Sequence, residues 1–500
     1  MQNGTLLAAL DLGSNSFRLE IGRLDHGQIR RTEYLKEFVR QGNGLDEARN
    51  LSADAMQRGL DCLARFGERL AGFKKHQVRA VATQTLREAR NRDEFLARGH
   101  AVLGFPIDVI PGREEARLIY QGVARLLPQS DEKRLVVDIG GRSTEMILGQ
   151  GYEAKVMDSF RVGSVAWSMR YFPKGEFKAD AFRVAQIAAK AVLDEALDAY
   201  GKNTWTMAYG ASGTVGAVAD VLTAAGWAPG VIPRAGLQWL MERLLKAETV
   251  DKLRIEGMKD DRKLVIGGGL SVLLAVFDLL GIEEMQAADG ALRHGVLYDL
   301  MEREDADSDV RSTSVQRLAA KFDTDAAQSR RVGAAATRFF EQLQACAGAP
   351  SEDGDRLHRK LGWAAQLHEI GFLVSHGDYH RHGAYVLEHA DAPGFATPEL
   401  HRLGLLVLGH RGKLRKLEAE LSDAAFAQQL LALRLAVILC HARRDPDLDG
   451  LQLSAKPGQP GRKLSCRAGW ADAFPQSAHL LREEAAAWNK TPWPLQLQGL

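Results

Sequence analysis

The feature that most constrains the fold of this chain is a strand–turn–strand pattern that occurs twice. The first copy covers residues 7–22 (LAALDLGSNSFRLEIG), and the second covers residues 134–149 (RLVVDIGGRSTEMILG). The copies match at four positions, which are the pairs Asp11 and Asp138, Gly13 and Gly140, Ser16 and Ser143, and Gly22 and Gly149. In each copy an apolar run ends in Asp and is followed by a Gly/Ser turn and a second run, a pattern typical of a β-hairpin. We therefore expect two related subdomains, each built around one hairpin.

A single hairpin of this kind is most often a surface turn, but two matched copies favour a binding site. Successive backbone N–H groups of a tight turn point into one concavity, which binds phosphate oxygens. The residues expected to bind phosphate in this way are Ser14, Asn15, Ser16, Gly140, Gly141 and Ser143. Asp11 and Asp138 end their strands at the mouth of the turn, where a carboxylate can hold a divalent cation. Arg18 aligns with Glu145, so one hairpin offers a cation to phosphate and the other offers a carboxylate to a metal.

Composition and charge exclude several classes of protein. The chain has 500 residues, 45% of them hydrophobic and 26% charged, which excludes a disordered or low-complexity chain. Because Lys and Arg number 65 and Asp and Glu number 64, any site for a polyanion must be local. The four cysteines fit neither a zinc site nor a disulfide framework. The N-terminus lacks the features of a signal peptide, and the apolar stretch 264–282 is interrupted by three glycines and Asp278, so we expect a cytoplasmic protein with no membrane partner.

The chain changes character near residue 305. Before that point strands and helices alternate, and beyond it Ala/Leu-rich windows such as 312–347 and 424–443 predict helices. Ten of the fourteen histidines lie in the second part, and the acidic stretch 302–309 is a candidate linker. We expect α/β subdomains at residues 1–125 and 126–305, followed by an all-α domain at residues 306–500.

Five segments in order resemble the exopolyphosphatase/guanosine pentaphosphatase family of the actin-like ATPase superfamily. These segments are Asp11–Leu19, Ala82–Ala89, Pro111–Ile119, Asp138–Glu145 and Gly210–Thr214. The resemblance implies two actin-like (ribonuclease H-like) subdomains that flank a cleft. One position departs from the family pattern, because Arg142 stands where the pattern has a third glycine. If that position requires a positive φ, the substitution costs on the order of 1 kcal/mol; otherwise the guanidinium could point at substrate phosphates.

The same resemblance implies roles for residues outside the hairpins. Glu115 maps onto the glutamate that orients the attacking water, and Arg87 could clamp the terminal phosphate. Alternatively, Glu114 and Glu115 are first-turn glutamates that complement a helix N-terminus, and Arg87 is a solvated helix arginine. Further phosphate contacts are expected from a loop at a helix N-terminus and from one arginine, namely Gly210, Ser212, Gly213, Thr214 and Arg293. The expected cofactor is Mg²⁺, held by Asp11, Asp138 and Glu145.

The histidine-rich part is similar to the metal-dependent phosphohydrolase domains named for a His-Asp pair. Here the pair is His368-Glu369, so we expect a degenerate, non-catalytic relative of that HD-like domain. A basic cluster in this part is either a solvated helix face or a track for long polyphosphate; it comprises Arg381, Arg411, Lys413, Arg415 and Lys416. No aromatic residues alternate with bases, so nucleic acid is not an expected partner.

These features predict a Mg²⁺-dependent exopolyphosphatase that removes terminal phosphates from inorganic polyphosphate. The close alternative is hydrolysis of the terminal phosphate of guanosine pentaphosphate to give the tetraphosphate, because the phosphate end of the two substrates is shared. Two alternatives belong to other classes: a sugar kinase, for which we find no sugar-binding segment, and a non-catalytic sensor of polyphosphate or alarmone. We also expect a homodimer.

Overall fold

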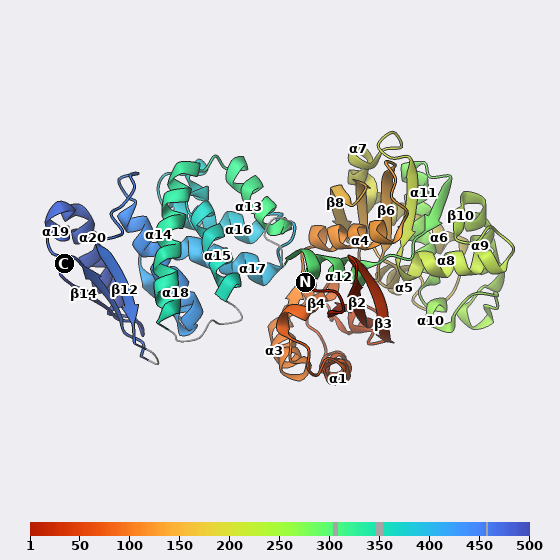
Figure 1. The fold of residues 1–500 in the computed structure, drawn as a ribbon. Coiled ribbons are helices and arrows are strands. Elements are labelled where there is room, and N and C mark those ends of the chain that lie inside the picture. The colour runs from red at the N-terminus through yellow and green to blue at the C-terminus, as the bar shows by residue number, and fades with distance from the viewer. Residues whose placement is uncertain (304–308, 347–353, 457–458) are drawn as a thin grey trace. The chain divides into compact units, whose positions relative to one another are not determined.

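The computed structural model describes residues 1–303, 309–346, 354–456 and 459–500. The chain divides into two compact units, Met1–Asp309 and Val310–Leu500 (Figure 1). The expected boundary after residue 305 lies outside the described residues. In the described part of the chain, no helix combines the length and apolar character needed to cross a membrane.

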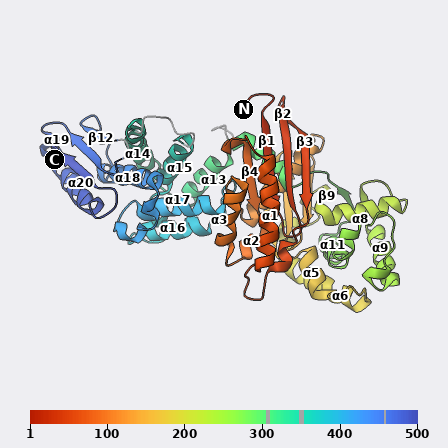
Figure 2. The ribbon, with the colours of Figure 1, turned by 90° about the horizontal axis from the view of Figure 1, so that it is seen from below.

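The first unit begins with a five-stranded sheet in the order β3-β2-β1-β4-β5. Its strands are β1 (Leu6–Leu12), β2 (Phe17–Asp25), β3 (Gln28–Glu37), β4 (Val78–Ala82) and β5 (Ile107–Val109). The associated helices are α1 (Ala53–Arg69), α2 (Gln84–Glu88) and α3 (Arg92–Leu103). Figure 2 shows β1, β2 and β3 side by side, with α1 against them. Buried side chains of α1, such as Leu63 and Phe66, join those of the strands in one core.

A six-stranded sheet follows, in the order β10-β11-β9-β6-β7-β8. Its strands are β6 (Lys133–Ile139), β7 (Thr144–Gln150), β8 (Glu153–Phe160), β9 (Met207–Ala211), β10 (Val231–Pro233) and β11 (Glu284–Ala287). Its helices are α5 (Ser164–Tyr171), α6 (Ala179–Leu193), α7 (Leu197–Tyr200), α8 (Ser212–Ala224), α9 (Arg234–Ala247), α10 (Asp260–Lys263) and α11 (Ile266–Leu280). Five strands of this sheet repeat the order of the first sheet, since β8-β7-β6-β9-β11 corresponds to β3-β2-β1-β4-β5.

The repeated sequence pattern folds as two hairpins with the same register. Asp11 lies opposite Arg18 between β1 and β2, and Asp138 lies opposite Glu145 between β6 and β7. A Cβ added at Gly13 or at Gly140 would lie 3.1 Å from a serine carbonyl three residues on, so both turns close in the same way. The predicted hairpins and their alignment are therefore confirmed.

Two helices, α4 (Gly112–Leu126) and α12 (Leu292–Arg303), lie side by side between the sheets (Figure 1). Helix α4 packs on β7 and β8, whereas α12 packs on β1, β2 and β4, so the chain returns to the first sheet before the unit ends. The helices approach closely because both carry glycine at the contact. A Cβ at Gly295 would lie 1.8 Å from the Leu118 carbonyl oxygen, and one at Gly122 would lie 2.3 Å from that of Ala291.

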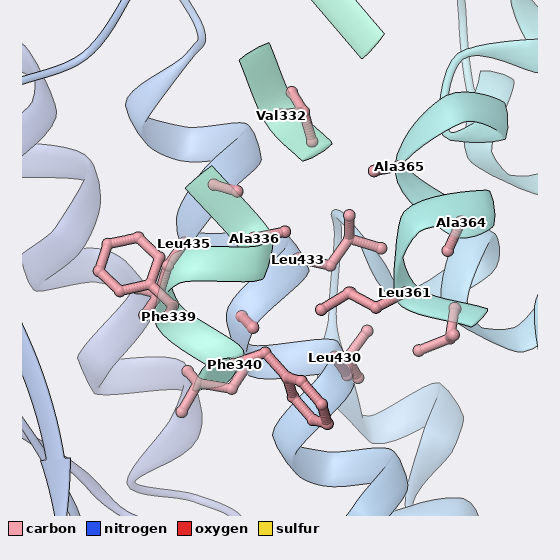
Figure 3. Close-up of a cluster of buried hydrophobic side chains, with 14 of the residues drawn as sticks. Val332, Ala336, Phe339, Phe340, Leu361, Ala364, Ala365, Leu430, Leu433 and Leu435 are labelled. Atoms are coloured by element: carbon pink, nitrogen blue, oxygen red, sulfur yellow. The ribbon is translucent and has the colours of Figure 1, made fainter. Parts of the chain in front are cut away.

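The second unit is predominantly helical, as the sequence predicts. Its helices are α13 (Val310–Lys321), α14 (Ala326–Ala345), α15 (Gly354–Leu367), α16 (Tyr379–His389), α17 (Thr397–Gly409), α18 (Ala424–Leu439), α19 (Trp470–Ala473) and α20 (Pro475–Trp488). Figure 3 shows side chains of α14, α15 and α18 meeting in its core. Asp325 and Asp423 cap α14 and α18 by accepting hydrogen bonds from backbone N–H groups.

The second unit also contains a small sheet that the sequence analysis does not predict. Its strands are β12 (Leu451–Ala455), β13 (Arg462–Cys466) and β14 (Leu495–Gln498). Leu451, Leu453, Leu464 and Leu495 point into the helical core, so the sheet covers one side of it.

Candidate active site

A cavity of about 90 Å³ lies where the two hairpin turns, α4 and α8 meet in the first unit. Thirteen of the predicted site residues line it: Asp11, Ser14, Asn15, Ser16, Arg18, Glu115, Asp138, Gly140, Gly141, Ser143, Ser212, Gly213 and Thr214. The two turns touch each other, because a Cβ at Gly141 would lie 3.2 Å from the Ser14 Cβ. These residues come from four separate sequence segments, which therefore converge on one polar site.

The structure separates the two neighbouring glutamates of α4. Glu115 lines the cavity, and its Oε2 accepts a hydrogen bond of 2.7 Å from Arg87 Nη1. Glu114 points the other way, where it forms two hydrogen bonds with Arg117, of 2.8 and 2.9 Å, and lies 3.6 Å from Arg79. Of the two carboxylates, Glu115 is therefore the one placed to meet a substrate.

Arg87 is held in place by three acceptors. Its Nη1 donates to the Ile110 carbonyl at 2.8 Å as well as to Glu115, and its Nε and Nη2 donate to Gln84 Oε1 at 3.1 and 2.7 Å. Arg87 does not line the cavity itself, so in this arrangement it contacts Glu115 rather than the cavity interior. A guanidinium in that position stabilises the ionised form of the glutamate.

Three buried carboxylates, Glu115, Asp138 and Glu145, lie in surroundings that disfavour their charged forms. Burial and the nearby Glu115 raise the pKa of Asp138 to about 7. Burial, Glu115 and Asp138 raise the pKa of Glu145 well above its usual range, although it accepts a 2.7 Å hydrogen bond from Ser159. The pKa of Glu115 is raised by burial in spite of Arg87. A cation bound among these groups would favour their charged forms.

The donor set fits Mg²⁺ held by few protein ligands. No three His, Cys, Asp or Glu side chains form a ready-made metal cage in the described ranges. Asp11 and Asp138 nevertheless line the cavity, and Glu145 lies behind Asp138 across the hairpin. Asp11 also accepts a 2.9 Å hydrogen bond from Arg18. Hard carboxylate oxygens that leave most coordination positions to water and phosphate are what Mg²⁺ prefers.

The first residue of α8 has a strained backbone at the cavity wall. Ser212 has a φ of 79°, which lies in the left-handed region that non-glycine residues rarely adopt. The hydroxyls of Ser212 and Thr214 both donate to the Ile139 carbonyl, at 2.8 and 3.0 Å. These bonds tie the first turn of α8 to β6, the strand that leads into the second hairpin turn.

Three further predicted residues lie outside the cavity. Glu145 is almost fully buried behind it, and Gly210 is enclosed by Met285 and Val215. Arg293 points to the first sheet, where its Nε donates to Glu20 at 2.5 Å. The structure therefore brings Glu145 close to the site but does not bring Gly210 or Arg293 to its surface.

The chain matches two family models that together cover most of its length. Residues 21–304 match the Ppx/GppA phosphatase family, and residues 310–485 match Ppx/GppA phosphatase domain III. The chain belongs to the Ppx/GppA phosphatase family. The resemblance inferred from the five segments is confirmed.

Curated relatives in this family extend over the whole chain. A Vibrio cholerae serotype O1 protein named guanosine-5′-triphosphate,3′-diphosphate pyrophosphatase is 38% identical over 99% of this chain and 98% of its own length. An Aeromonas hydrophila protein with the same name is 36% identical over 99% of both chains.

Solved structures of Ppx/GppA proteins share the fold of this chain. The Aquifex aeolicus PPX-GPPA enzyme is 25% identical, with a TM-score of 0.50, over 59% of this chain and 99% of its own. An exopolyphosphatase from Cytophaga hutchinsonii is 24% identical, with a TM-score of 0.53, over 59% of this chain and 98% of its own. The expected α/β fold with two actin-like subdomains is therefore confirmed.

Several residues that the sequence analysis does not name also line the site of this Ppx/GppA protein. Thr83, Ser164 and Arg262 do so, and a Cβ at Gly213 would lie 2.3 Å from the Arg262 guanidinium. Arg262 comes from α10, a four-residue helix with no phosphate-loop pattern. The basic pair Arg262-Lys263 ahead of the three glycines at 267–269 was its signal, and that signal is weak.

Arg142, the departure from the family pattern, needs no unusual backbone. The non-glycine residues with positive φ in the described part of the chain include Ser212 but not Arg142. The expected strain is therefore absent at this position. The guanidinium lies against Glu88 and the Gly42 carbonyl, on the first-sheet side of the cavity.

In the domain III region, the His368-Glu369 pair is engaged in contacts within the fold. His368 Nδ1 lies 2.7 Å from the Ala365 carbonyl oxygen, and Arg443 donates to Glu369 Oε1 at 2.8 Å. The residues of the basic cluster are exposed: Arg381, Arg411, Lys413, Arg415 and Lys416. Their role as a polyphosphate track stays a prediction, as does the homodimer.

Proposed function

We propose that this protein hydrolyses the terminal phosphate of the 5′-triphosphate of guanosine 5′-triphosphate 3′-diphosphate. The products are inorganic phosphate and the guanosine tetraphosphate. The carrying observation is the match of the whole chain, at 38% identity, to relatives named for that substrate. Inorganic polyphosphate is the first substrate expected from the motifs, but these relatives favour the alternative, guanosine pentaphosphate.

The geometry supports a hydrolysis driven by Glu115. A water molecule between the Glu115 carboxylate and the terminal phosphorus would be oriented for attack, and Glu115 would accept its proton. The bond between the terminal phosphorus and the bridging oxygen then breaks, and the leaving group is the diphosphate arm. Through the 2.7 Å contact Arg87 favours the ionised form of Glu115 and opposes the effect of burial, which raises the pKa of that carboxyl.

The two hairpin turns supply the phosphate contacts. Their backbone N–H groups, with Ser14, Ser16 and Ser143, would bind the non-bridging oxygens of the phosphate chain. Asp11, Asp138 and Glu145 would hold Mg²⁺, which when bound neutralises charge on the bridging and terminal phosphate oxygens.

Cations at the edge of the cavity suit a substrate with many phosphates. Arg18 and Arg262 line it, and Lys36 lies close enough to both for them to affect its charge. Burial, with the repulsion of Arg262 and Arg18, lowers the pKa of Lys36 to about 8. A polyanion placed among these three groups would reduce their mutual repulsion.

The test is a comparison of kcat/KM for guanosine pentaphosphate, GTP, tripolyphosphate and long-chain polyphosphate at one salt concentration. We expect the pentaphosphate to be preferred by at least about tenfold, a difference of about 1.4 kcal/mol in transition-state stabilisation. The Glu115→Gln variant, purified in the same way, controls for contaminating phosphatases. A preference for long-chain polyphosphate would overturn the substrate assignment, and tight binding without turnover would indicate a sensor.

A further inference from the structure

The side chain of Arg142 joins the two sheets of the first unit across the candidate active site. It starts from the turn of the second hairpin and reaches residues of the first-sheet side. Its Nη2 lies 3.0 Å from Glu88 Oε2, and its Nη1 donates to the Gly42 carbonyl at 3.2 Å. Only 22% of the Arg142 side chain and 14% of the Glu88 side chain are exposed, so water screens this ion pair weakly.

The surroundings of Arg142 leave room for it and little else. A Cβ at Gly163 would lie 2.5 Å from the Arg142 backbone nitrogen, and a Cβ at Gly42 would lie 3.2 Å from the Arg142 Cδ. Gly163 therefore leaves room for the Arg142 backbone, and Gly42 leaves room for the Arg142 side chain. The contact is built into the local packing and is not a chance orientation of a surface arginine.

A continuous set of hydrogen bonds leads from Arg142 to Glu115. Glu88 Oε1 accepts from Gln84 Nε2 at 2.6 Å, while the other oxygen of Glu88 faces Arg142. Gln84 Oε1 in turn accepts from Arg87 Nε and Nη2, and Arg87 Nη1 donates to Glu115. Gln84, Arg87 and Glu88 all belong to the short helix α2. The contact of Arg142 with Glu88, at the end of this helix, therefore affects the positions of all three side chains.

The Gln84 side chain makes this chain of contacts directional. Its amide nitrogen can only donate and its amide oxygen can only accept, and the two ends are used on Glu88 and Arg87 respectively. If Glu88 loses its contact with Arg142, the Glu88 carboxylate is no longer fixed and no longer orients the Gln84 side-chain amide. Arg87 would then lose one of the acceptors that aim its guanidinium at Glu115.

We propose that Arg142 is a positioning residue that fixes Arg87 and Glu115 through Glu88 and Gln84 when the two sheets meet around the site. The inference rests on the proposed role of Glu115 as the residue that orients water. It concerns the position at which the sequence departs from the family pattern. An error of about 1 Å in the placement of a catalytic group is enough to cost about 100-fold in rate.

The test is a set of variants at the outer end of these contacts. We expect Arg142→Ala and Glu88→Gln each to lower kcat by about 10- to 100-fold and to change KM by less than about threefold. The double variant Arg142→Ala/Glu88→Gln should be no slower than either single variant, because both remove the same contact. Arg142→Lys, which keeps one cation toward Glu88, should recover part of the lost kcat.

The assay uses whichever of guanosine pentaphosphate, GTP and tripolyphosphate the wild-type protein hydrolyses fastest. A wrong substrate assignment then changes the choice of substrate and leaves the comparison among variants valid. Thermal unfolding confirms that each variant is folded, and Glu88→Gln keeps the shape of the site if Arg142→Ala is unstable. An unchanged kcat would overturn the proposal. So would a raised KM with additive losses in the double variant, the result expected if Arg142 instead contacts the substrate.

Discussion

At the scale of single residues, neighbours decide what each carboxylate can do. Glu114 and Glu115 are adjacent in sequence, yet one lies in a buried cluster with Arg117 and Asp299 and the other lines the cavity. Successive residues on a helix point in directions about 100° apart, so the two cannot share a site. The same residue type is therefore structural at one position and a candidate catalyst at the next.

We predict that Glu115→Gln lowers kcat by about 10²- to 10⁴-fold and leaves KM nearly unchanged, because the amide cannot accept the proton of water. Glu114→Gln is the matched comparison. It should lower the free energy of unfolding by about 2 kcal/mol or more, since it weakens a buried charge cluster, while the folded variant keeps its kcat. Steady-state kinetics and thermal unfolding check both. Equal losses of kcat in the two variants would contradict the separation of roles.

Asp138 predicts a pH dependence of stability in the absence of Mg²⁺. Its pKa of about 7 in the folded protein exceeds the ordinary value near 3.9, so between these pH values the folded state binds the proton more tightly. The resulting stability is present below about pH 4 and is lost as the pH rises to about 7. Asp138→Asn should therefore raise the free energy of unfolding at pH 8 by on the order of 2 kcal/mol.

Thermal unfolding of wild type and Asp138→Asn from pH 5 to pH 8, with EDTA and then with Mg²⁺, measures this effect. The gap between the two proteins should widen with pH in EDTA and narrow when Mg²⁺ is added. Asp180→Asn, a change at an exposed aspartate of α6, is the control and should follow the wild type. A gap that is constant with pH would contradict the raised pKa of Asp138.

At the scale of elements, the contact between α4 and α12 connects the two sheets. Helix α4 also contains Glu115. We predict that Gly295→Ala lowers the free energy of unfolding by about 3 kcal/mol and also lowers kcat. The added Cβ would lie 1.8 Å from the Leu118 carbonyl oxygen and would push α4 away from α12. Gly333→Ala on α14 is the control, since its nearest neighbour would be the Ala365 Cβ at 3.8 Å. It should leave stability unchanged or raise it by about 0.5–1 kcal/mol. Similar unfolding temperatures for the two variants would contradict this account of the helix contact.

The elements were predictable from sequence where the signal is local. The register that places Asp11 opposite Arg18 follows from a turn of fixed length between the two runs of the predicted hairpin. The sheet of β12, β13 and β14 was missed because its strands have only four or five residues, too few for their alternation to predict a strand by itself. Contacts between distant residues were not predictable. Arg293 is an example, because its partner Glu20 lies 273 residues away and no local sequence pattern indicates the pair. Contacts between distant segments, such as Arg142 with Glu88, depend on packing that spacing alone does not encode.

At the scale of the whole molecule, the second unit is a separate compact body with its own core. Variants of its exposed basic cluster test whether that unit binds long polyanions. We predict that Lys413→Glu/Arg415→Glu leaves kcat/KM for guanosine pentaphosphate within about twofold but weakens binding of long-chain polyphosphate. The slope of log affinity against log salt should also become shallower for each phosphate contact that is lost. An unchanged salt slope would mean that the cluster is a solvated face.

The most direct test of the central claim is the stoichiometry of phosphate release from guanosine pentaphosphate by wild type and Glu115→Gln. The account predicts one inorganic phosphate and one guanosine tetraphosphate per substrate molecule with the wild type, and a rate lower by about 10²-fold or more with the variant. Release of pyrophosphate would contradict it, because water would then attack a different phosphorus. Equal rates for the two proteins would contradict it as well, because Glu115 would then have no part in the reaction.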